Sequence, residues 1–189
     1  MPQAYAQCSL YLHPKAHDFT IEETSSFITK LQKISFISQV TNKQNDHSYF
    51  TGEKFLDYIA YMGCAPSFQF EANAGNENSD SNFCFIKIHS YQSPCLIHNQ
   101  QQAIAPHCPN CKKPVKDWAD NKTDSAINCN QCSTRSNIEA FNWRKMAGYA
   151  QLFIEINDIF PKEAIPQQTL LDKLSKISNT DWQYFYSCK

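Results

Sequence analysis

The chain has 189 residues, of which 42% are hydrophobic and 13% aromatic, enough for one substantial core or for one core with a small appended module. No apolar run approaches the roughly 20 residues of a membrane-spanning helix, and the N-terminus lacks the basic start and apolar stretch of a secretion signal. The formal net charge of −1 excludes a general electrostatic attraction to nucleic acid or acidic membranes. We therefore expect a soluble, cytoplasmic protein with no membrane partner.

The N-terminal third of the chain is predicted to alternate between strands and helices. Hydrophobic periodicity places these elements at 5–12 (strand), 21–33 (helix), 34–40 (strand) and 52–62 (helix). Thr20 and Glu23 have the spacing of a capping box at the start of the first helix. Gly63 suits a left-handed cap at the end of the second. Residues 71–82 are polar and predict a long loop.

Two short apolar segments, 83–89 and 94–98, flank the polar residues 90–93 and predict a β-hairpin. Cysteine and histidine occur on both predicted strands, so a second Cys/His cluster across the hairpin is one hypothesis. Its members would be Cys84, His89, Cys95 and His98. The alternative is that the two cysteines pack as small hydrophobic residues. The pairing register, which the sequence leaves open, decides between them.

Two Cys-x-x-Cys pairs follow, Cys108/Cys111 and Cys129/Cys132, at the spacing of a four-cysteine zinc site. Each pair can form a tight turn that points two thiolates at one metal ion. Four thiolates close the coordination shell, so we expect one structural zinc and not a catalytic one. Iron and a redox-active dithiol are the alternatives.

The segment 105–135 resembles the zinc-ribbon group of proteins, with short strands expected at 114–118 and 126–128. Ribbon knuckles commonly carry glycine directly after the second cysteine, whereas this chain has Lys112 and Ser133 there. With the Trp143–Gly148 and Trp182–Tyr186 segments, the Cys-Pro-x-Cys knuckle also resembles small bacterial proteins with a central zinc ribbon. That resemblance implies no activity.

The C-terminal part predicts a strand at 151–156, a helix at 166–178 and a strand at 182–186. We therefore predict an α+β fold: a single domain with a mixed or antiparallel sheet and about three helices, interrupted by the inserted ribbon. The core would comprise 1–104 and 136–189, and the ribbon 105–135. The nine cysteines are odd in number, so we interpret the five outside the ribbon (Cys8, Cys64, Cys84, Cys95 and Cys188) as unpaired thiols.

Positive charge is concentrated near the ribbon, since residues 101–150 hold seven lysines and arginines against four acidic residues. The candidate partner-contact residues are Lys112, Lys113, Lys116, Trp118, Lys122 and Arg144. Lysines around an exposed tryptophan would suit a nucleic-acid backbone and one stacked base. In the alternative, Trp118 packs inside the ribbon. Arg144 is a candidate for an ion pair with Glu155 or Glu163, or for an anion site.

No phosphate-binding loop, nucleophile elbow or dinucleotide fingerprint is present in the sequence. The leading hypothesis is a zinc-binding, non-catalytic adaptor that docks on a protein or ribonucleoprotein assembly. One alternative is an enzyme with a His/Cys site in the core domain, and another is direct nucleic-acid binding through the ribbon lysines.

Overall fold

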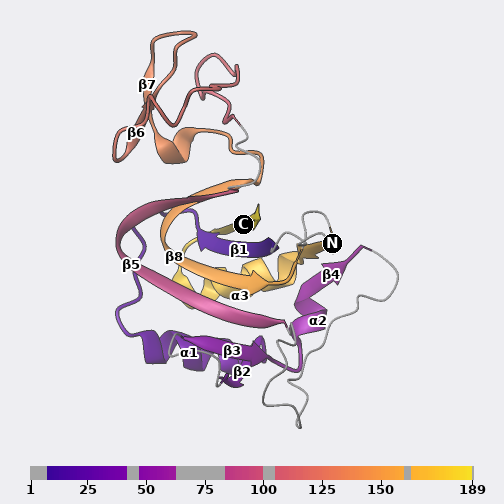
Figure 1. Ribbon diagram of the computed structural model, residues 1–189. Coiled ribbons are helices and arrows are strands. Elements are labelled where there is room, and N and C mark those ends of the chain that lie inside the picture. Colours follow the sequence, from indigo (N-terminus) through magenta and orange to yellow (C-terminus); the bar gives the residue numbers. More distant parts are fainter. Residues whose placement is uncertain (1–7, 42–46, 63–83, 100–104, 160–162, 189) are drawn as a thin grey trace, which may run out of the picture.

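The computed structural model describes residues 8–41, 47–62, 84–99, 105–159 and 163–188 (Figure 1). Three α-helices lie in these residues: α1 (Thr24–Lys33), α2 (Phe55–Tyr58) and α3 (Gln168–Ser178). A short 3-10 helix spans Ile138–Ala140. The strands are β1 (Cys8–Pro14), β2 (Ile37–Val40), β3 (Ser48–Thr51), β4 (Ile59–Tyr61), β5 (Phe85–His98), β6 (Ala126–Asn128), β7 (Arg135–Asn137), β8 (Ala147–Asn157), β9 (Ala164–Pro166) and β10 (Trp182–Cys188). The fold is α+β, as the sequence predicts.

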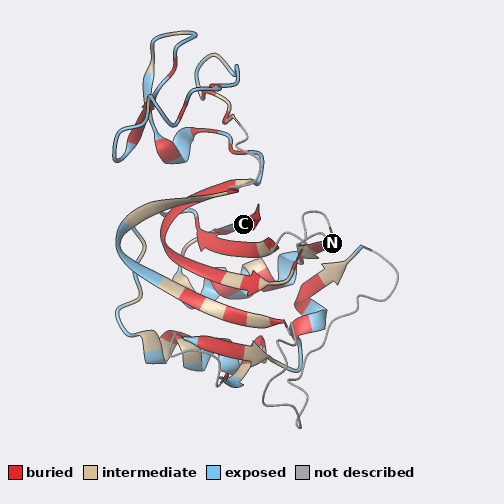
Figure 2. Ribbon diagram, viewed as in Figure 1, coloured by how far each residue is buried: buried red, intermediate tan, exposed pale blue. Residues whose placement is uncertain are grey.

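Six strands form one antiparallel sheet in the order β10-β1-β8-β5-β3-β2. The adjacent strands β1 and β8, second and third in this order, are the most deeply buried (Figure 2). The main hydrophobic core lies on one sheet face, where α1 and α3 contribute Leu31 and Leu174, both fully buried. α3 is amphipathic, and its buried residues Leu170 and Leu174 both lie in this core.

The opposite face carries a second, smaller cluster of Tyr11, Ala150, Phe153 and Phe185. Here the sheet curls, and the beginning of β8 lies close against β10. A Cβ atom on Gly148 would lie 2.4 Å from the ring of Phe185 and 2.6 Å from Nε2 of His13. No side chain fits in that space, so glycine at this position permits the close approach of the two strands.

β5 corrects the predicted hairpin. The described residues 84–98 do not turn back, because 85–98 form one 14-residue strand alongside β8. The register shifts between Ser90 and Cys95, where the polar residues form an irregularity in the strand. The amide of Gln151 donates to the carbonyl oxygens of Gln92 (2.8 Å) and Tyr91 (3.4 Å) there. Residues 90–93 were predicted to turn because they are polar, but pairing with the long strand β8 keeps them extended apart from this irregularity.

Both predicted N-terminal helices are shorter than expected. α1 begins at Thr24, and no side chain caps it, because Phe19 and Ile21 pack against the core in a non-helical segment. The predicted helix at 52–62 is helical only over Phe55–Tyr58, since the next three residues form β4 and pair with β9. Gly63, Cys64 and the predicted loop at 71–82 lie outside the described residues.

The cysteine-rich segment forms a lobe above the sheet in Figure 1. Its hairpin is β6–β7, with Ala126 opposite Asn137. The hairpin therefore ends two residues beyond 135, the predicted end of the ribbon. The strand predicted at 114–118 is absent; the segment is mostly turn, with one bridge between Pro114 and His107. A hydrophobic cluster continues from the lobe into the start of β8 at Ala147 and Tyr149.

Candidate metal centre

The two Cys-x-x-Cys pairs form two similar backbone turns. In the first, the N–H of Lys112 donates to the carbonyl of Cys108 (3.0 Å); in the second, Ser133 donates to Cys129 (2.8 Å). Lys112 and Ser133, which occupy the usual glycine position, have φ values of 60° and 55°. The departure from glycine therefore leaves the left-handed geometry of the knuckles intact, at the energetic cost of a non-glycine residue in that region.

The four Sγ atoms converge. All lie within 4.8 Å of one another, with Cys108–Cys132 at 3.8 Å and Cys111–Cys129 at 3.7 Å. A tetrahedron with Zn–S bonds of about 2.3 Å has sulfur–sulfur edges of roughly 3.8 Å. The four cysteines that the sequence singled out can thus hold a metal ion, and the spacing fits a tetrahedral four-thiolate site.

The electrostatic surroundings of the four thiols differ. Hydrogen bonds from the Thr134 hydroxyl and backbone N–H lower the pKa of Cys132 to about 6, which favours the thiolate form that binds metal. Burial raises the pKa of Cys129. The metal binds cysteine in its thiolate form, so metal binding would release protons from the cysteine ligands.

Trp118 packs beneath the metal centre and corrects one predicted role. Its side chain is only 5% exposed, and its ring makes edge contacts with Trp143 at 5.0 Å and His98 at 5.3 Å. The indole N–H of Trp143 in turn donates to the carbonyl of Ile138 (3.1 Å). Because the Trp118 ring is enclosed by the lobe and the end of β5, it is not free to stack on a nucleic-acid base.

The four candidate lysines are exposed and occupy different parts of the lobe. Lys112 donates to its neighbouring carbonyl at Pro109 (2.6 Å). Lys113 and Lys116 line a groove of about 460 Å³ together with Asn130 and Gln131. Lys122 lies close enough to Cys95 of β5 to act electrostatically on its thiol. They do not surround an exposed aromatic ring.

The predicted second Cys/His cluster is not formed. Because 85–98 is one strand, Cys95, His89 and His98 are spread along it, and Cys84 is buried next to its start. Burial raises the pKa of the Cys84 thiol to about 12, so this thiol is inert at neutral pH. Among the described residues, only the four lobe cysteines form a group that could hold a metal ion.

His89 instead belongs to a partly buried polar network that sequence reasoning missed. Its Nε2 lies 2.7 Å from Oε2 of Glu155, and the Ser9 hydroxyl donates to Oε1 at 2.8 Å. Burial by itself raises the pKa of Glu155, but the hydrogen bonds from His89 and Ser9, with a smaller contribution from Tyr11, lower it to about 2. The only sequence signal was a lone acidic residue in an apolar strand.

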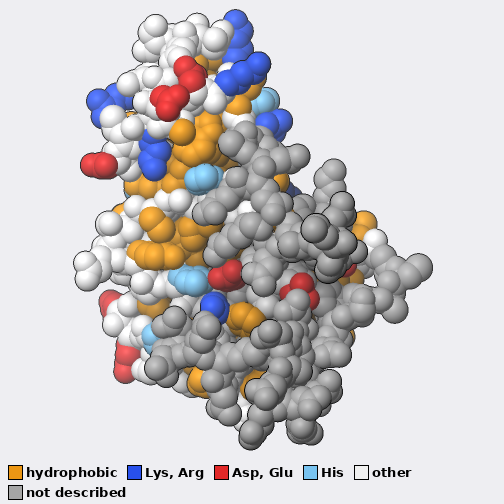
Figure 3. Space-filling model, in the orientation of Figure 1, with side chains coloured by type: hydrophobic (Ala, Val, Ile, Leu, Met, Phe, Trp, Pro, Cys, Tyr) orange, Lys and Arg blue, Asp and Glu red, His pale blue; other side chains and the backbone are white. Residues whose placement is uncertain are grey.

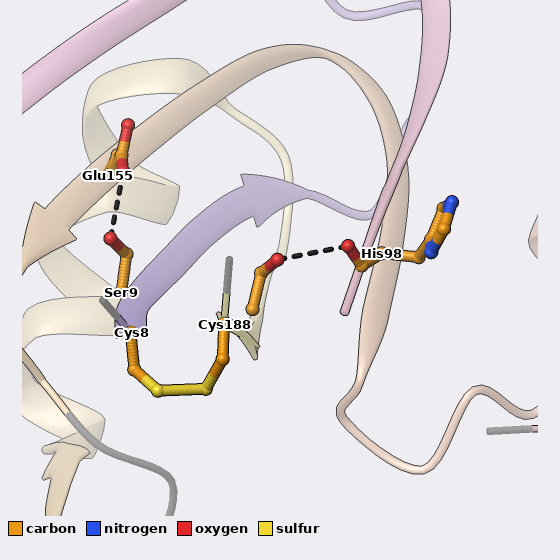
Figure 4. The surroundings of a disulfide bond; sticks show 6 residues. Cys8, Ser9, His98, Glu155 and Cys188 are labelled. Atoms are coloured by element: carbon orange, nitrogen blue, oxygen red, sulfur yellow. Dashed lines mark hydrogen bonds between the residues drawn. A yellow bond between two sulfur atoms is a disulfide. The ribbon is translucent and has the colours of Figure 1, made fainter. Parts of the chain in front are cut away.

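A disulfide joins Cys8 to Cys188, which corrects their interpretation as unpaired thiols (Figure 4). The two residues face each other at the ends of β1 and β10, with Cα atoms 4.0 Å apart. Nearby, the hydroxyl of Ser187 donates to the carbonyl of His98 at 3.0 Å. Disulfides persist mainly in oxidising compartments, so this bond does not support the predicted cytoplasmic localisation, which stays a prediction.

Arg144 forms no ion pair with any described residue, so the predicted ion pair is wrong. Its guanidinium donates to the carbonyl of Ala105 at 3.3 Å, while Glu155 pairs with His89.

Within the described part of the chain, no helix is long and apolar enough to cross a membrane. No protein-family model, curated protein or solved structure matches this chain.

Proposed function

We propose that the chain is a zinc-binding, non-catalytic adaptor whose metal lobe docks on a protein or ribonucleoprotein assembly. The observation that carries this proposal is the convergence of four cysteine sulfurs at tetrahedral spacing. Zinc is favoured over iron because a thiolate tetrahedron on two knuckles is the usual structural zinc site. A shell of four thiolates leaves no position for water or substrate, so the metal has a structural role.

A protein partner is favoured over direct nucleic-acid binding. Trp118 is buried, which removes the stacking platform that would support single-stranded binding. Hydrophobic side chains gather on the face of the molecule shown in Figure 3, between the lobe and the sheet below it. The half-buried Cys95, Leu96 and Ile97 and the 40% exposed Tyr91 lie on the strand that reaches the lobe. Such a patch supports docking by apolar burial.

Metal content tests the first part of the proposal. Full-length protein purified without added metal should contain about one zinc per chain by mass spectrometry, because two knuckles supply one complete shell. The double variant Cys108→Ser with Cys132→Ser should lose nearly all of it, whereas Cys95→Ser should keep it. Iron in place of zinc, or full occupancy in the double variant, would contradict the assignment.

Affinity capture from the native cell tests the docking. We expect the same protein to be captured at low and high salt, because apolar burial is weakly salt-dependent. Glutamate at Lys112, Lys113, Lys116 and Lys122 should weaken capture little. A matched control carries glutamate at four exposed lysines elsewhere: Lys30, Lys33, Lys54 and Lys173. Nuclease-sensitive capture that is lost both at high salt and in the lobe variant would favour direct nucleic-acid binding instead.

A further inference from the structure

A pocket of about 200 Å³ lies away from the metal centre, between the base of the lobe and β10. The polar side chains that line it and matter here are His13, Asn142, Arg144, Lys145, Gln183 and Tyr184. Its volume is sufficient for several waters or one small ligand. Three features of this pocket point to the same class of ligand.

The first feature is a strained turn that presents two cations. The N–H of Met146 donates to the carbonyl of Trp143 at 3.0 Å, and the two residues between them, Arg144 and Lys145, have φ values of 52° and 59°. These values define a type I′ turn, which strongly favours Asn-Gly. Two long cationic side chains in left-handed conformations are costly, and such strain is concentrated at functional sites.

The second feature is that no described acidic residue pairs with either cation. The guanidinium of Arg144 donates to the carbonyl of Ala105, and Nζ of Lys145 lies 4.1 Å from the ring centre of Tyr184 and 2.5 Å from its hydroxyl. Neither forms an ion pair with a described residue. Because the Tyr184 oxygen accepts from Lys145, the hydroxyl proton remains available to donate. The one acidic residue in the lining, Glu139, has His17 as its nearby basic group, at 3.9 Å.

The third feature is a buried histidine with an available nitrogen. His13 is 3% exposed, and its Nδ1 donates to the carbonyl of Pro14 at 2.9 Å. Burial lowers the pKa of His13 to about 4, so the ring is neutral at pH 7 and Nε2 carries a lone pair. Among the described residues, Nε2 has no hydrogen-bond partner. It can therefore accept a proton donor from a ligand but repels an oxyanion that has none.

We propose that this pocket binds free inorganic phosphate. Its anionic oxygens would meet Arg144, Lys145 and the Tyr184 hydroxyl, and its remaining P–OH would donate to Nε2 of His13. A phosphate monoester loses its last proton near pH 6 and would offer His13 no donor at neutral pH. Sulfate has the same shape and charge but also lacks that proton.

Calorimetric titration of the full-length, metal-loaded protein at pH 7.5 tests the proposal with inorganic phosphate, sulfate and methyl phosphate. Phosphate should bind at least tenfold more tightly than either of the others, because only it satisfies His13. Arg144→Asn combined with Lys145→Gly keeps the turn and removes both charges. This variant should unfold at the same or a higher temperature than the wild type, since the turn strain is relieved, and bind phosphate at least tenfold more weakly.

Lys112→Gly is the matched control, because it removes a lysine from another left-handed position outside the pocket. It should leave phosphate affinity unchanged. The proposal is overturned if phosphate does not bind the wild type at millimolar concentration, if the three anions bind equally, or if the turn variant retains its affinity. Thermal unfolding of each variant establishes that a loss of binding is not a loss of fold.

Discussion

Glu155 shows how a single residue can couple the stability of the sheet to pH. Even a partly buried carboxylate is costly unless hydrogen bonds compensate its charge, and His89 and Ser9 provide them for Glu155. Because the folded-state pKa of about 2 lies below the ordinary value of 4.5, ionised Glu155 stabilises the folded state. That contribution is fully present above about pH 4.5 and is lost as the pH falls toward 2.

We predict that Glu155→Gln lowers the free energy of unfolding by about 1–3 kcal/mol at pH 7, since charge-assisted hydrogen bonds are lost. The difference from wild type should shrink between pH 4.5 and 2. Urea unfolding across this range measures it, with the exposed Glu22→Gln as control. The variant is compared with the wild type at each pH because acid also releases a thiolate-bound metal, which changes the stability of both proteins. A difference that stays constant from pH 7 to 2 would contradict the assignment.

At the scale of elements, the first and last strands are paired along their whole length. β1 and β10 run antiparallel from Cys8 opposite Cys188 to Pro14 opposite Trp182. β10 is an edge strand, so β1 is its only neighbour in the sheet order. The disulfide closes a loop with a sequence separation of 180 and so constrains the unfolded chain strongly.

Replacing both cysteines, Cys8→Ser with Cys188→Ser, should therefore lower the free energy of unfolding by about 2–5 kcal/mol. Hydrogen exchange in β10 should rise more than in β8, which is held on both sides. Cys95→Ser is the control for loss of a partly buried thiol. A reductant should destabilise the wild type but not the double variant. Equal stability of the two under oxidising conditions would argue against the disulfide.

At the scale of the molecule, the lobe and the sheet share a continuous hydrophobic cluster. It extends from Cys108 and Cys129 through Trp118 and Trp143 to Tyr149 of β8. The main core on the helix-covered face of the sheet contains none of these residues. Metal binding is therefore expected to stabilise the lobe and the nearest end of β8, but not the whole sheet.

Chelation should consequently abolish hydrogen-exchange protection over residues 105–143 and leave it in β1, α3 and the second half of β8. Exchange measured by mass spectrometry before and after chelation tests this expectation. Cys108→Ser should give the same pattern without a chelator. Loss of protection throughout β1 and α3 would show instead that the metal holds the entire fold together.

Features set by short sequence separations could be predicted from the sequence. The Cys-x-x-Cys pairs form knuckles because each turn is closed within about five residues, even with lysine and serine at the left-handed positions. The amphipathic stripe predicted α3, although Pro166 lies in β9 and the helix begins at Gln168. The apolar segments that form β8 and β10 were predicted for the same local reason.

Tertiary structure alone decided the features that join distant segments. The residues expected to turn at 90–93 continue as strand because β8 runs beside them, and Cys8 meets Cys188 only because β1 pairs with β10. Glu155 meets His89 and Ser9 across three strands, and the backbone turn at Arg144 meets His13 and β10. Sequence periodicity reports which side of an element is buried, but the partner across the interface is fixed by packing of the whole chain.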